Sequence, residues 1–349
     1  MAERSGGDGP AVAGVTVAIP VRNGGELLGR TLRSLSAQTV EHELLVCDSG
    51  SRDGSPGLAR AHGARVIEIP TSRFSHGGTR NMLMAEAAGS HVAFLTQDAE
   101  PEDERWLERL LAGFSLAADV AIVYGPYRPR RDASLPVRLE LERWFASLSP
   151  AGAPVVERLS EQRRGRGALD LVGRPGFFTD ANAGVLRSAW QRVPFREVPY
   201  AEDRVLAIDM LRAGYAKAYV PEAGVLHSHD YTTLEELRRS FDEGRALREV
   251  YGWVEPAAPA PVLRRLRGEL GQARRELRQA GMPPPARAAA LAAVGRRACA
   301  RMLGAALGSR ADMLPATLRR GLSLERRGGF AAIDLGQSAE LPAKREAQT

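Results

Sequence analysis

Residues 15–51 read VTVAIPVRNGGELLGRTLRSLSAQTVEHELLVCDSGS, and this stretch decides the fold class. Two short apolar runs rich in β-branched residues, 15–21 and 43–49, predict strands, because such runs suit a buried sheet. The leucines between them recur at the spacing of one helix face. The segment therefore predicts a β-α-β unit.

The same alternation continues after this unit. The pattern predicts a helix at 55–63, a strand at 64–70, a helix at about 79–88 and a strand at 91–96. Strands that alternate with amphipathic helices at this pitch predict an α/β fold, in which a mostly parallel sheet is covered on both faces.

Polar residues end each of these four predicted strands. The strands run into PVRN, DSGSRDGS, TSRFSHGGTRN and TQDAEP, in that order. In parallel sheets, ligands sit beyond the carboxyl ends of the strands. We therefore expect these segments to form one convergent polar rim.

The composition fits an intracellular globular protein. Of the 349 residues 44% are hydrophobic, which is enough to bury a substantial core. No uninterrupted apolar run reaches the roughly 18 residues of a membrane span. Residues 1–14 lack the pattern of a secretory signal, so we expect a short disordered lead.

Missing motifs exclude several chemistries. Cys47 and Cys299 are far apart and outside any C-x-x-C spacing, so neither a disulfide framework nor a thiolate zinc site is indicated. No G-x-G-x-x-G follows the first predicted strand, and no G-x-x-x-x-G-K-[ST] occurs. These absences count against dehydrogenases and ATPases.

Positive charge is concentrated near the C-terminus. Residues 261–330 contain fifteen arginines and four acids, a net charge of +11, whereas the whole chain carries +6. Proline-rich breakers divide residues 256–330 into two predicted basic helices, and residues 331–349 have no strong pattern. The segment lacks the aromatic residues interleaved with basic ones that are expected of single-strand nucleic-acid binders, so an anionic membrane surface is the better partner.

Two of the polar segments suit a nucleotide. Asp48 and Asp53 in CDSGSRDGS follow a strand, where an acid can accept the donors of a base or ribose; an Asx turn with a helix cap is the alternative. Arg80 and Asn81 in HGGTRN lie in the first turn of a predicted helix, which suits a phosphate; an ordinary capped helix is the alternative.

Asp98 in FLTQDAEP is a candidate metal ligand. A divalent cation that holds a diphosphate takes only one or two protein carboxylates, because phosphate oxygens and waters fill its other positions. An exposed acid after an edge strand is the alternative interpretation.

Two further segments offer titratable pairs. Glu202 and Asp203 start a predicted helix, where one can act as a general base and the other can cap the helix; a solvated acidic turn is the alternative. His227 and His229 in HSHD share one face of a predicted strand and can bind metal or phosphate, or be ordinary strand histidines.

Taken in order, AIPVRN, CDSGSRDGS, HGGTRN, FLTQDAEP, TDANAGVLRSAW, AEDRVLAIDMLRAGY and VLHSHDYT resemble an inverting family 2 glycosyltransferase of GT-A fold over about residues 15–250. FSHGGTRN, TQDAEP and HSHDYT are most similar to the bacterial rhamnosyltransferase-like branch, which builds cell-surface polysaccharides. The resemblance implies a nucleotide-sugar-binding half at 15–125 and an acceptor and catalytic half at 126–255. The basic helical extension at 256–330 and the predicted disordered tail at 331–349 match no motif of the family.

The resemblance also implies roles for individual residues. Asp203 matches the general base, with Glu202 as the second candidate; Asp98 matches the last acid of the D-x-D metal motif, whose first acid is replaced by Thr96; and His229 reaches toward the metal and diphosphate. The donor-binding residues implied are Pro20, Arg22, Asn23, Asp48, Ser49, Asp53, Arg80, Asn81, Gln97 and Asp98, and those that shape the sugar and acceptor pocket are Asp180, Asn182 and Glu202.

The activity implied is transfer, with inversion, of a hexose or deoxyhexose such as rhamnose from a dTDP- or UDP-linked donor to a glycan or lipid-linked acceptor. Mg²⁺ or Mn²⁺ is the implied cofactor, and the location is cytoplasmic, peripheral at the inner face of the membrane. Two alternatives stay open: an inactive nucleotide-sugar-binding protein, against which the intact AED segment argues, and a membrane-associated interaction module that acts through the basic extension.

Overall fold

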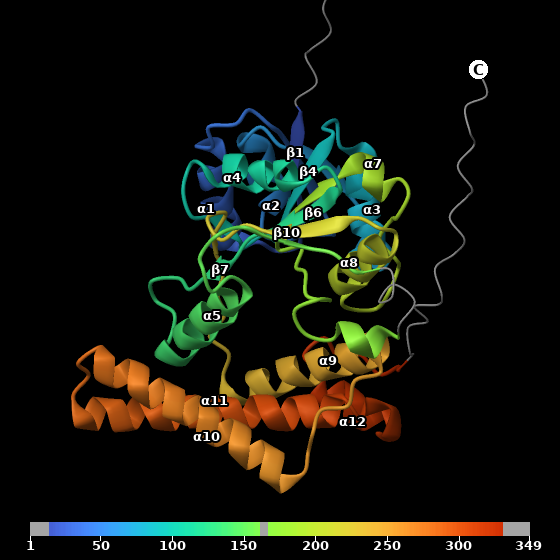
Figure 1. Ribbon diagram of the computed structural model, residues 1–349. Helices are drawn as coiled ribbons and strands as arrows, with labels where there is room; N and C mark the ends of the chain where they lie inside the picture. The colour runs from blue at the N-terminus through green and yellow to red at the C-terminus, as the bar shows by residue number, and fades with distance from the viewer. Residues whose placement is uncertain (1–13, 161–166, 331–349) are drawn as a thin grey trace, which may run out of the picture.

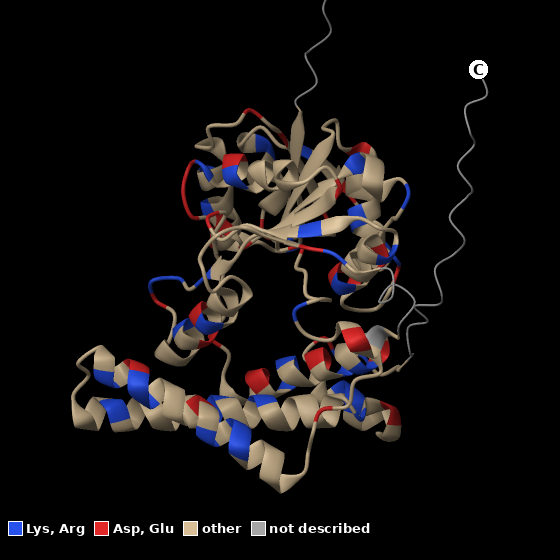
Figure 2. Cartoon of the chain, viewed as in Figure 1, with Lys and Arg blue, Asp and Glu red and all other residues tan. Residues whose placement is uncertain are grey.

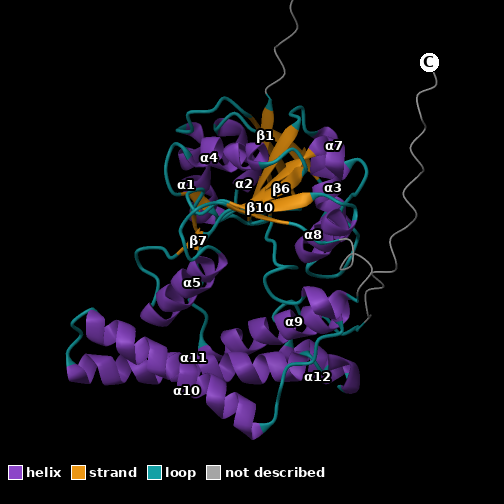
Figure 3. Cartoon of the chain, in the orientation of Figure 1, coloured by secondary structure: helices purple, strands orange, loops and turns teal. Residues whose placement is uncertain are grey.

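The structure is a computed structural model that describes residues 14–160 and 167–330. The predicted disordered lead, except Gly14, and the predicted tail lie outside the described residues. Figures 1 and 3 show an α/β domain above a layer that is built from helices.

Among the described residues, eight strands form the main sheet. In sheet order they are β3 (Arg65–Glu68), β2 (Glu43–Asp48), β1 (Val15–Val21), β4 (His91–Leu95), β9 (Asn182–Leu186), β6 (Val120–Tyr124), β10 (Ala216–Tyr219) and β8 (Val155–Glu157). β3, β2, β1 and β4 are parallel to one another, and β10 is parallel to β6. β9 is antiparallel to β4 and β6, and β8 is antiparallel to β10. The prediction of a mostly parallel sheet is confirmed.

Helices cover both faces of this sheet. Alternate side chains of β1 enter two different cores, because successive residues of a strand point to opposite faces. One core receives apolar side chains from α1 (Gly25–Ser36), α2 (Ser55–Ala61) and α4 (Trp106–Ala112), and the other from α3 (His76–Glu86), α7 (Arg187–Trp190) and α8 (Glu202–Arg212). Of the leucines that predicted α1, Leu28, Leu32 and Leu35 are buried in the first core and Leu27 is half-buried.

A small second sheet brings distant loops together. It pairs β11 (Val225–Leu226) with β5 (Glu100–Pro101) and β7 (Tyr127–Arg128). Since Leu226 lies opposite Glu100 in the antiparallel pair, the residues after β11 return alongside the residues before β5. The sequence predicted one strand that reaches His229, which is wrong: the strand divides into β10 and β11, and the histidines follow in a loop.

The helical layer contains α9 (Thr233–Tyr251), α10 (Pro259–Gln279), α11 (Pro284–Gly308) and α12 (Ala316–Leu322), and α5 (Leu135–Leu148) lies between it and the sheet in Figure 1. α11 approaches α9 closely at two glycines. A Cβ at Gly304 would come within 2.2 Å of the Leu237 carbonyl oxygen, and one at Gly308 within 2.0 Å of that of Phe241. The remaining short helices are η1 (Thr71–Arg73), η2 (Gly113–Leu116), η3 (Ala168–Leu171) and η4 (Ala311–Met313).

Arginines of the C-terminal helices pair with acids of neighbouring helices. Arg297 of α11 lies 2.6 Å from Glu236 of α9 and 2.9 Å from Glu140 of α5, and Arg301 lies 2.6 Å from Glu269 of α10. Figure 2 shows acidic and basic bands interleaved along these helices. Part of the positive charge that the sequence concentrates here is therefore neutralised within the layer.

Candidate functional site

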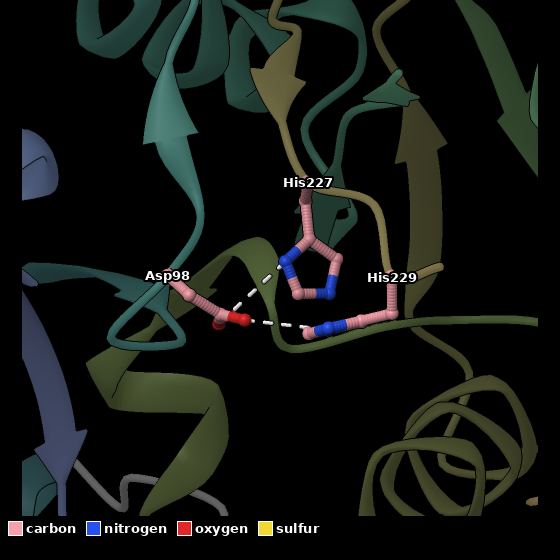
Figure 4. Close-up of side chains that lie close together, drawn as sticks. All are labelled: Asp98, His227 and His229. Atoms are coloured by element: carbon pink, nitrogen blue, oxygen red, sulfur yellow. Dashed lines mark ion pairs between the residues drawn. The ribbon is translucent and has the colours of Figure 1, made fainter. Parts of the chain in front are cut away.

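Asp98, His227 and His229 lie together, and we call them the Asp98 corner. Asp98 follows β4 and the histidines follow β11, so the pairing of β5 with β11 brings them side by side. His227 Nδ1 lies 3.6 Å from Asp98 Oδ1, and His229 Nε2 lies 3.3 Å from Asp98 Oδ2 (Figure 4). One candidate ligand atom from each residue lies within 4.8 Å of the others.

The protein holds this corner in place with neighbouring groups. Arg130 donates hydrogen bonds to the backbone carbonyls of Asp98 and Ser228, which ties the two loops together. The ring of Tyr127 packs edge-on against His227, with 4.7 Å between ring centroids, and Tyr231 stacks on His229. The three side chains are therefore positioned before any ligand binds.

The corner has the donor set of a divalent cation site. Burial acts to raise the pKa of Asp98, but His227, His229 and Thr96 outweigh it, so the pKa is lowered and the carboxylate stays charged. Burial lowers the pKa of His227 to about 4, which leaves a neutral imidazole at pH 7. The buried Nδ1 of His227 makes no hydrogen bond. A carboxylate and a neutral imidazole are the forms of these side chains that metal ions bind.

A second group of charges surrounds Arg80, and we call Arg80, Asp180, Glu202 and Asp203 the Arg80 cluster. The guanidinium, 4% exposed, donates a 2.8 Å hydrogen bond to Asp180 Oδ1 and lies 2.9 Å from Glu202 Oε1. Both carboxylates are also buried. The structure thus places Arg80 in internal ion pairs, and the implied contact with donor phosphates stays a prediction.

Asp203 differs from its neighbours in this cluster. Its Oδ1 accepts a hydrogen bond from the Arg204 backbone N–H, and the described residues offer it no ion pair. Burial and the nearby charge of Asp180 raise its pKa to about 7. Such a carboxyl exchanges a proton near neutral pH, which is the property a general base needs.

The backbone before α8 directs these acids. Ala201, directly before the helix, has φ 60°, in the left-handed region that disfavours residues with a Cβ. On its far side α8 packs on α9, because Val205 and Ile208 enter a third core with Ala246 and Val250. The first turn of α8 is therefore fixed by packing on both sides.

A cavity of about 1160 Å³ connects the two groups. His227 and Thr96 line it at the Asp98 corner, and Arg80, Asp180 and Asp203 line it at the Arg80 cluster. Two chemically different sets of side chains thus face one space.

The predicted donor-binding residues that follow β1, β2 and β4 are held by hydrogen bonds between these loops. The Arg22 backbone N–H donates to Gln97 Oε1 at 2.8 Å, and that of Asn23 to Ser51 Oγ at 2.7 Å. The Gly25 N–H donates to Asp53 Oδ2, and the Ser49 Oγ donates to the Val21 carbonyl next to Pro20. These contacts join the loops after β1, β2 and β4 into the predicted rim. The predicted donor-binding residues of these loops do not line the cavity.

Asp48, in this rim, has one carboxylate oxygen that no hydrogen bond uses. Its Oδ1 accepts hydrogen bonds of 2.9 Å from the backbone N–H groups of Gly50 and Ser51. Its buried Oδ2 has no hydrogen-bond partner. A buried acceptor without a donor costs free energy unless a ligand supplies one.

Two predicted site residues have their side chains in the protein interior. Asn81 bonds the backbone of Phe195 through both amide atoms and accepts from Trp190 Nε1. Asn182 accepts from Trp106 Nε1 and donates to the carbonyls of Pro126 and Ala223. Neither lines the cavity, and both side chains hold loops together; the interpretation that they contact donor or acceptor stays a prediction.

Comparison with known proteins identifies the family. Residues 16–191 match the family model described as "Glycosyl transferase family 2". The chain is 33% identical over 237 residues to the O-antigen chain rhamnosyltransferase RfbN of Salmonella typhimurium, which covers 66% of this chain and 71% of that protein. The chain belongs to glycosyltransferase family 2.

Other relatives agree with this family and its fold. The O-antigen chain rhamnosyltransferase WbaN of Salmonella anatum is 32% identical over 235 residues, 66% of this chain and 70% of that protein. The mannosyltransferase PcManGT from Pyrobaculum calidifontis, solved with GDP-Man and Mn²⁺, superposes with a TM-score of 0.53 at 19% identity over 87% of each chain. This glycosyltransferase therefore has the GT-A fold.

The family match covers Asp98 but ends before Asp203, His227 and His229. The placement of these three residues relative to Asp98 is therefore known from the structure and not from the family match. The described part of the chain contains no helix that is long and apolar enough to cross a membrane.

Sequence reasoning missed Arg130, and the family resemblance assigned the metal to Asp98 and His229 without His227. Arg130 lies in the basic turn YRPRRD, where nothing in the pattern distinguishes it from a solvated arginine. The H-x-H spacing was the signal for His227, but only the fold shows that both imidazoles face Asp98.

Proposed function

We propose that this family 2 glycosyltransferase transfers a hexose or deoxyhexose, such as rhamnose, from a dTDP- or UDP-linked donor to a glycan or lipid-linked acceptor, with inversion. The observation that carries the proposal is that His227, beside Asp98, and Asp203 line the same cavity. The Asp98 corner suits the departing diphosphate, and Asp203 suits the attacking hydroxyl. The rhamnosyltransferase relatives support the choice of sugar.

A single displacement accounts for the reaction. The acceptor hydroxyl oxygen forms a bond to the anomeric carbon while the bond from that carbon to the diphosphate oxygen breaks, and the electron pair leaves with the diphosphate. Asp203 takes the hydroxyl proton. One displacement reverses the configuration at the anomeric carbon, so an enzyme with one such base is expected to be inverting.

Asp98, His227 and His229 are the residues that would hold the divalent cation. When bound, such an ion neutralises charge on the diphosphate leaving group. Imidazole nitrogens favour transition metals, whereas Mg²⁺ prefers oxygen ligands and keeps several waters. We therefore expect Mn²⁺ to support activity better than Mg²⁺, although Thr96 replaces the first acid of D-x-D.

The test is a donor panel with purified protein. The protein is incubated with dTDP-rhamnose, UDP-glucose, UDP-galactose and GDP-mannose and Mn²⁺, and nucleotide release and thermal shifts are measured. We expect one donor to be turned over and to raise the melting temperature, since a ligand that binds the folded state stabilises it. NMR of the product's anomeric proton reports inversion.

Two outcomes separate this proposal from its rivals. Donor-induced stabilisation without turnover in the presence of acceptor lipid extracts would favour an inactive nucleotide-sugar-binding protein. No stabilisation and no turnover with any donor would contradict the proposal.

The C-terminal helices also support peripheral membrane contact at the cytoplasmic face. Arg264, Arg267, Arg274, Arg275 and Arg278 are exposed along α10 and have no ion pair among the described residues, whereas Ala273 and Leu277 on the other side are buried. A basic stripe without acids suits anionic headgroups, at about 1 kcal/mol for each arginine near the surface.

Vesicle flotation tests this contact. Replacing Arg264, Arg267 and Arg274 by glutamate is expected to lower binding to vesicles that contain phosphatidylglycerol by at least about 10-fold. The control replaces three exposed arginines of the α/β domain, Arg33, Arg131 and Arg192, in the same way. Equal loss in both variants would indicate net charge alone and would count against a membrane face on α10.

A further inference from the structure

The cavity is larger than the chemistry at its inner end requires. Its volume of about 1160 Å³ exceeds the roughly 300–1,000 Å³ of pockets that hold one drug-sized ligand. The Asp98 corner and the Arg80 cluster account only for the end beneath the sheet. The other end extends between α5 and the C-terminal helices, where Val294 and Met302 of α11 line it.

α5 presents one face to this outer end. Glu140, Arg143, Trp144 and Ser147 line the cavity and follow the i, i+3, i+4, i+7 spacing of one helix face. Trp144 is 39% exposed although it is a large aromatic residue in a cavity wall. Its ring packs edge-on against Phe177, with 5.0 Å between centroids.

The Trp144 and Phe177 pair is rigidly supported. Lys217, fully buried, donates hydrogen bonds to the backbone carbonyls of Phe177 at 2.6 Å and Arg174 at 2.8 Å, which fixes the loop that carries Phe177. The Arg204 guanidinium lies over the Phe177 ring, 5.7 Å from its centroid. An indole face in this setting is available to a ligand without a large ordering cost.

The charges around this aromatic pair cancel one another. Glu140 pairs with Arg297 at 2.9 Å, Arg301 with Glu269 at 2.6 Å and Arg143 with Glu276 at 2.9 Å. Such pairs still offer donors and acceptors to hydroxyl groups, but they present little net charge to a ligand. They also interrupt the apolar wall that a lipid chain would need.

We propose that the outer half of the cavity is a binding subsite for a neutral oligosaccharide, with Trp144 as the platform for a sugar beyond the one that is glycosylated. The C–H face of a pyranose ring is weakly positive and matches the negative face of the indole, and the paired charges bond its hydroxyls. The helical extension therefore forms one wall of the acceptor site. The inference rests on the proposed function, because it takes the acceptor to be a glycan.

A glycan array tests the subsite. Full-length protein with Mn²⁺, UDP and dTDP is applied to immobilised bacterial surface oligosaccharides of one to four residues, compared in sets that share their terminal sugar. We expect at least one set in which the longer members are retained at least about 10-fold more tightly than the single sugar. Trp144→Ala is expected to remove that difference and Trp144→Phe to restore part of it.

Glu142→Ala is the matched control, since Glu142 is an exposed residue of the same helix that does not line the cavity. Its length preference is expected to equal that of the unaltered protein. Melting temperatures and nucleotide-induced thermal shifts are measured for every variant, so that loss of fold or of donor binding is seen separately.

Retention independent of length, no retention of any glycan, or an unchanged preference in Trp144→Ala would each overturn the subsite. If nucleotide-induced shifts persist in those cases, the proposed function stands and only the subsite fails. Absence of any nucleotide shift contradicts the proposed function itself.

Discussion

The Asp98 corner and the Arg80 cluster contain the same kind of carboxyl group in opposite states. At the corner two imidazoles and Thr96 outweigh burial and lower the pKa of Asp98. In the cluster burial and Asp180 raise the pKa of Asp203 to about 7. A lowered pKa suits a permanent anionic ligand, whereas a pKa near 7 suits a group that accepts and releases a proton.

The difference suits the two separate roles that we propose for these acids. Both acids are half-buried, so exposure alone does not distinguish them. The neighbouring groups differ. Asp98 has imidazole nitrogens beside it, whereas the Arg80 guanidinium near Asp203 is already paired with Asp180 and Glu202. Environments that shift the pKa values of two carboxyls apart are a general sign of divided acid and base roles.

The largest expected effect comes from removing the base. Asp203→Asn keeps the shape of the side chain but cannot accept a proton, so kcat of sugar transfer is expected to fall about 100- to 10,000-fold. For the unaltered protein kcat is expected to rise with pH through about 7, as Asp203 ionises. Asp209→Asn, on the same helix but paired with Arg196, is the control and should keep kcat within about 2-fold. A full loss in Glu202→Gln alone would reassign the base.

Arg80→Met is expected to destabilise the protein by about 3–5 kcal/mol, because it leaves the buried carboxylates of Asp180 and Glu202 without a counter-charge. Urea unfolding at pH 7 measures the change. Adding Glu202→Gln to this variant should restore part of the loss, and Arg192→Met at the surface should have little effect. A loss below about 1 kcal/mol would mean that the cluster does not depend on Arg80.

Substitutions in the Asp98 corner and in the Arg80 cluster are expected to differ in their effect on metal affinity. Asp98→Asn, His227→Gln and His229→Gln are each expected to weaken Mn²⁺ binding at least about 10-fold in calorimetry. Asp203→Asn should leave Mn²⁺ binding unchanged, and His62→Gln, away from the corner, serves as a further control. If the histidine variants bind Mn²⁺ as the unaltered protein does, the corner is not the metal site.

The smallest expected effect is on stability as a function of pH. The folded pKa of Asp203, about 7, lies above its ordinary 3.8, so the folded state holds the proton more tightly and loses stability as pH rises between these values. Asp203→Asn removes this loss. The variant should therefore gain stability over the unaltered protein as the pH rises. The difference between their free energies of unfolding should be more than about 1 kcal/mol larger at pH 8 than at pH 5. Asp132, exposed before α5, is the control, and Asp132→Asn should show no such difference. If the free energy of unfolding of Asp203→Asn follows the same pH dependence as that of the unaltered protein, burial does not raise the pKa of Asp203.

By itself the sequence determined the parallel half of the sheet and the polar loops at its edge. Strand and helix spacings are local properties of the sequence, so the turn from β1 into α1 can be predicted without knowing its distant neighbours. The same holds for the C-terminal helices, whose proline breakers lie close to the observed starts of α10 and α11. Asp98 and Asp203 became candidates because each stands at the end or start of such an element.

Only the tertiary structure decided which polar groups meet. Nothing in the sequence shows that backbone carbonyls and indole N–H groups from distant segments bond the amides of Asn81 and Asn182. Arg130 looks solvated, yet it joins the Asp98 and His227 loops. Trp144 of α5 becomes part of a cavity wall only because Val294 and Met302 of the distant α11 line the same cavity. Hydrogen bonds and burial between residues far apart in the chain leave no local spacing, so they appear only when the chain is folded.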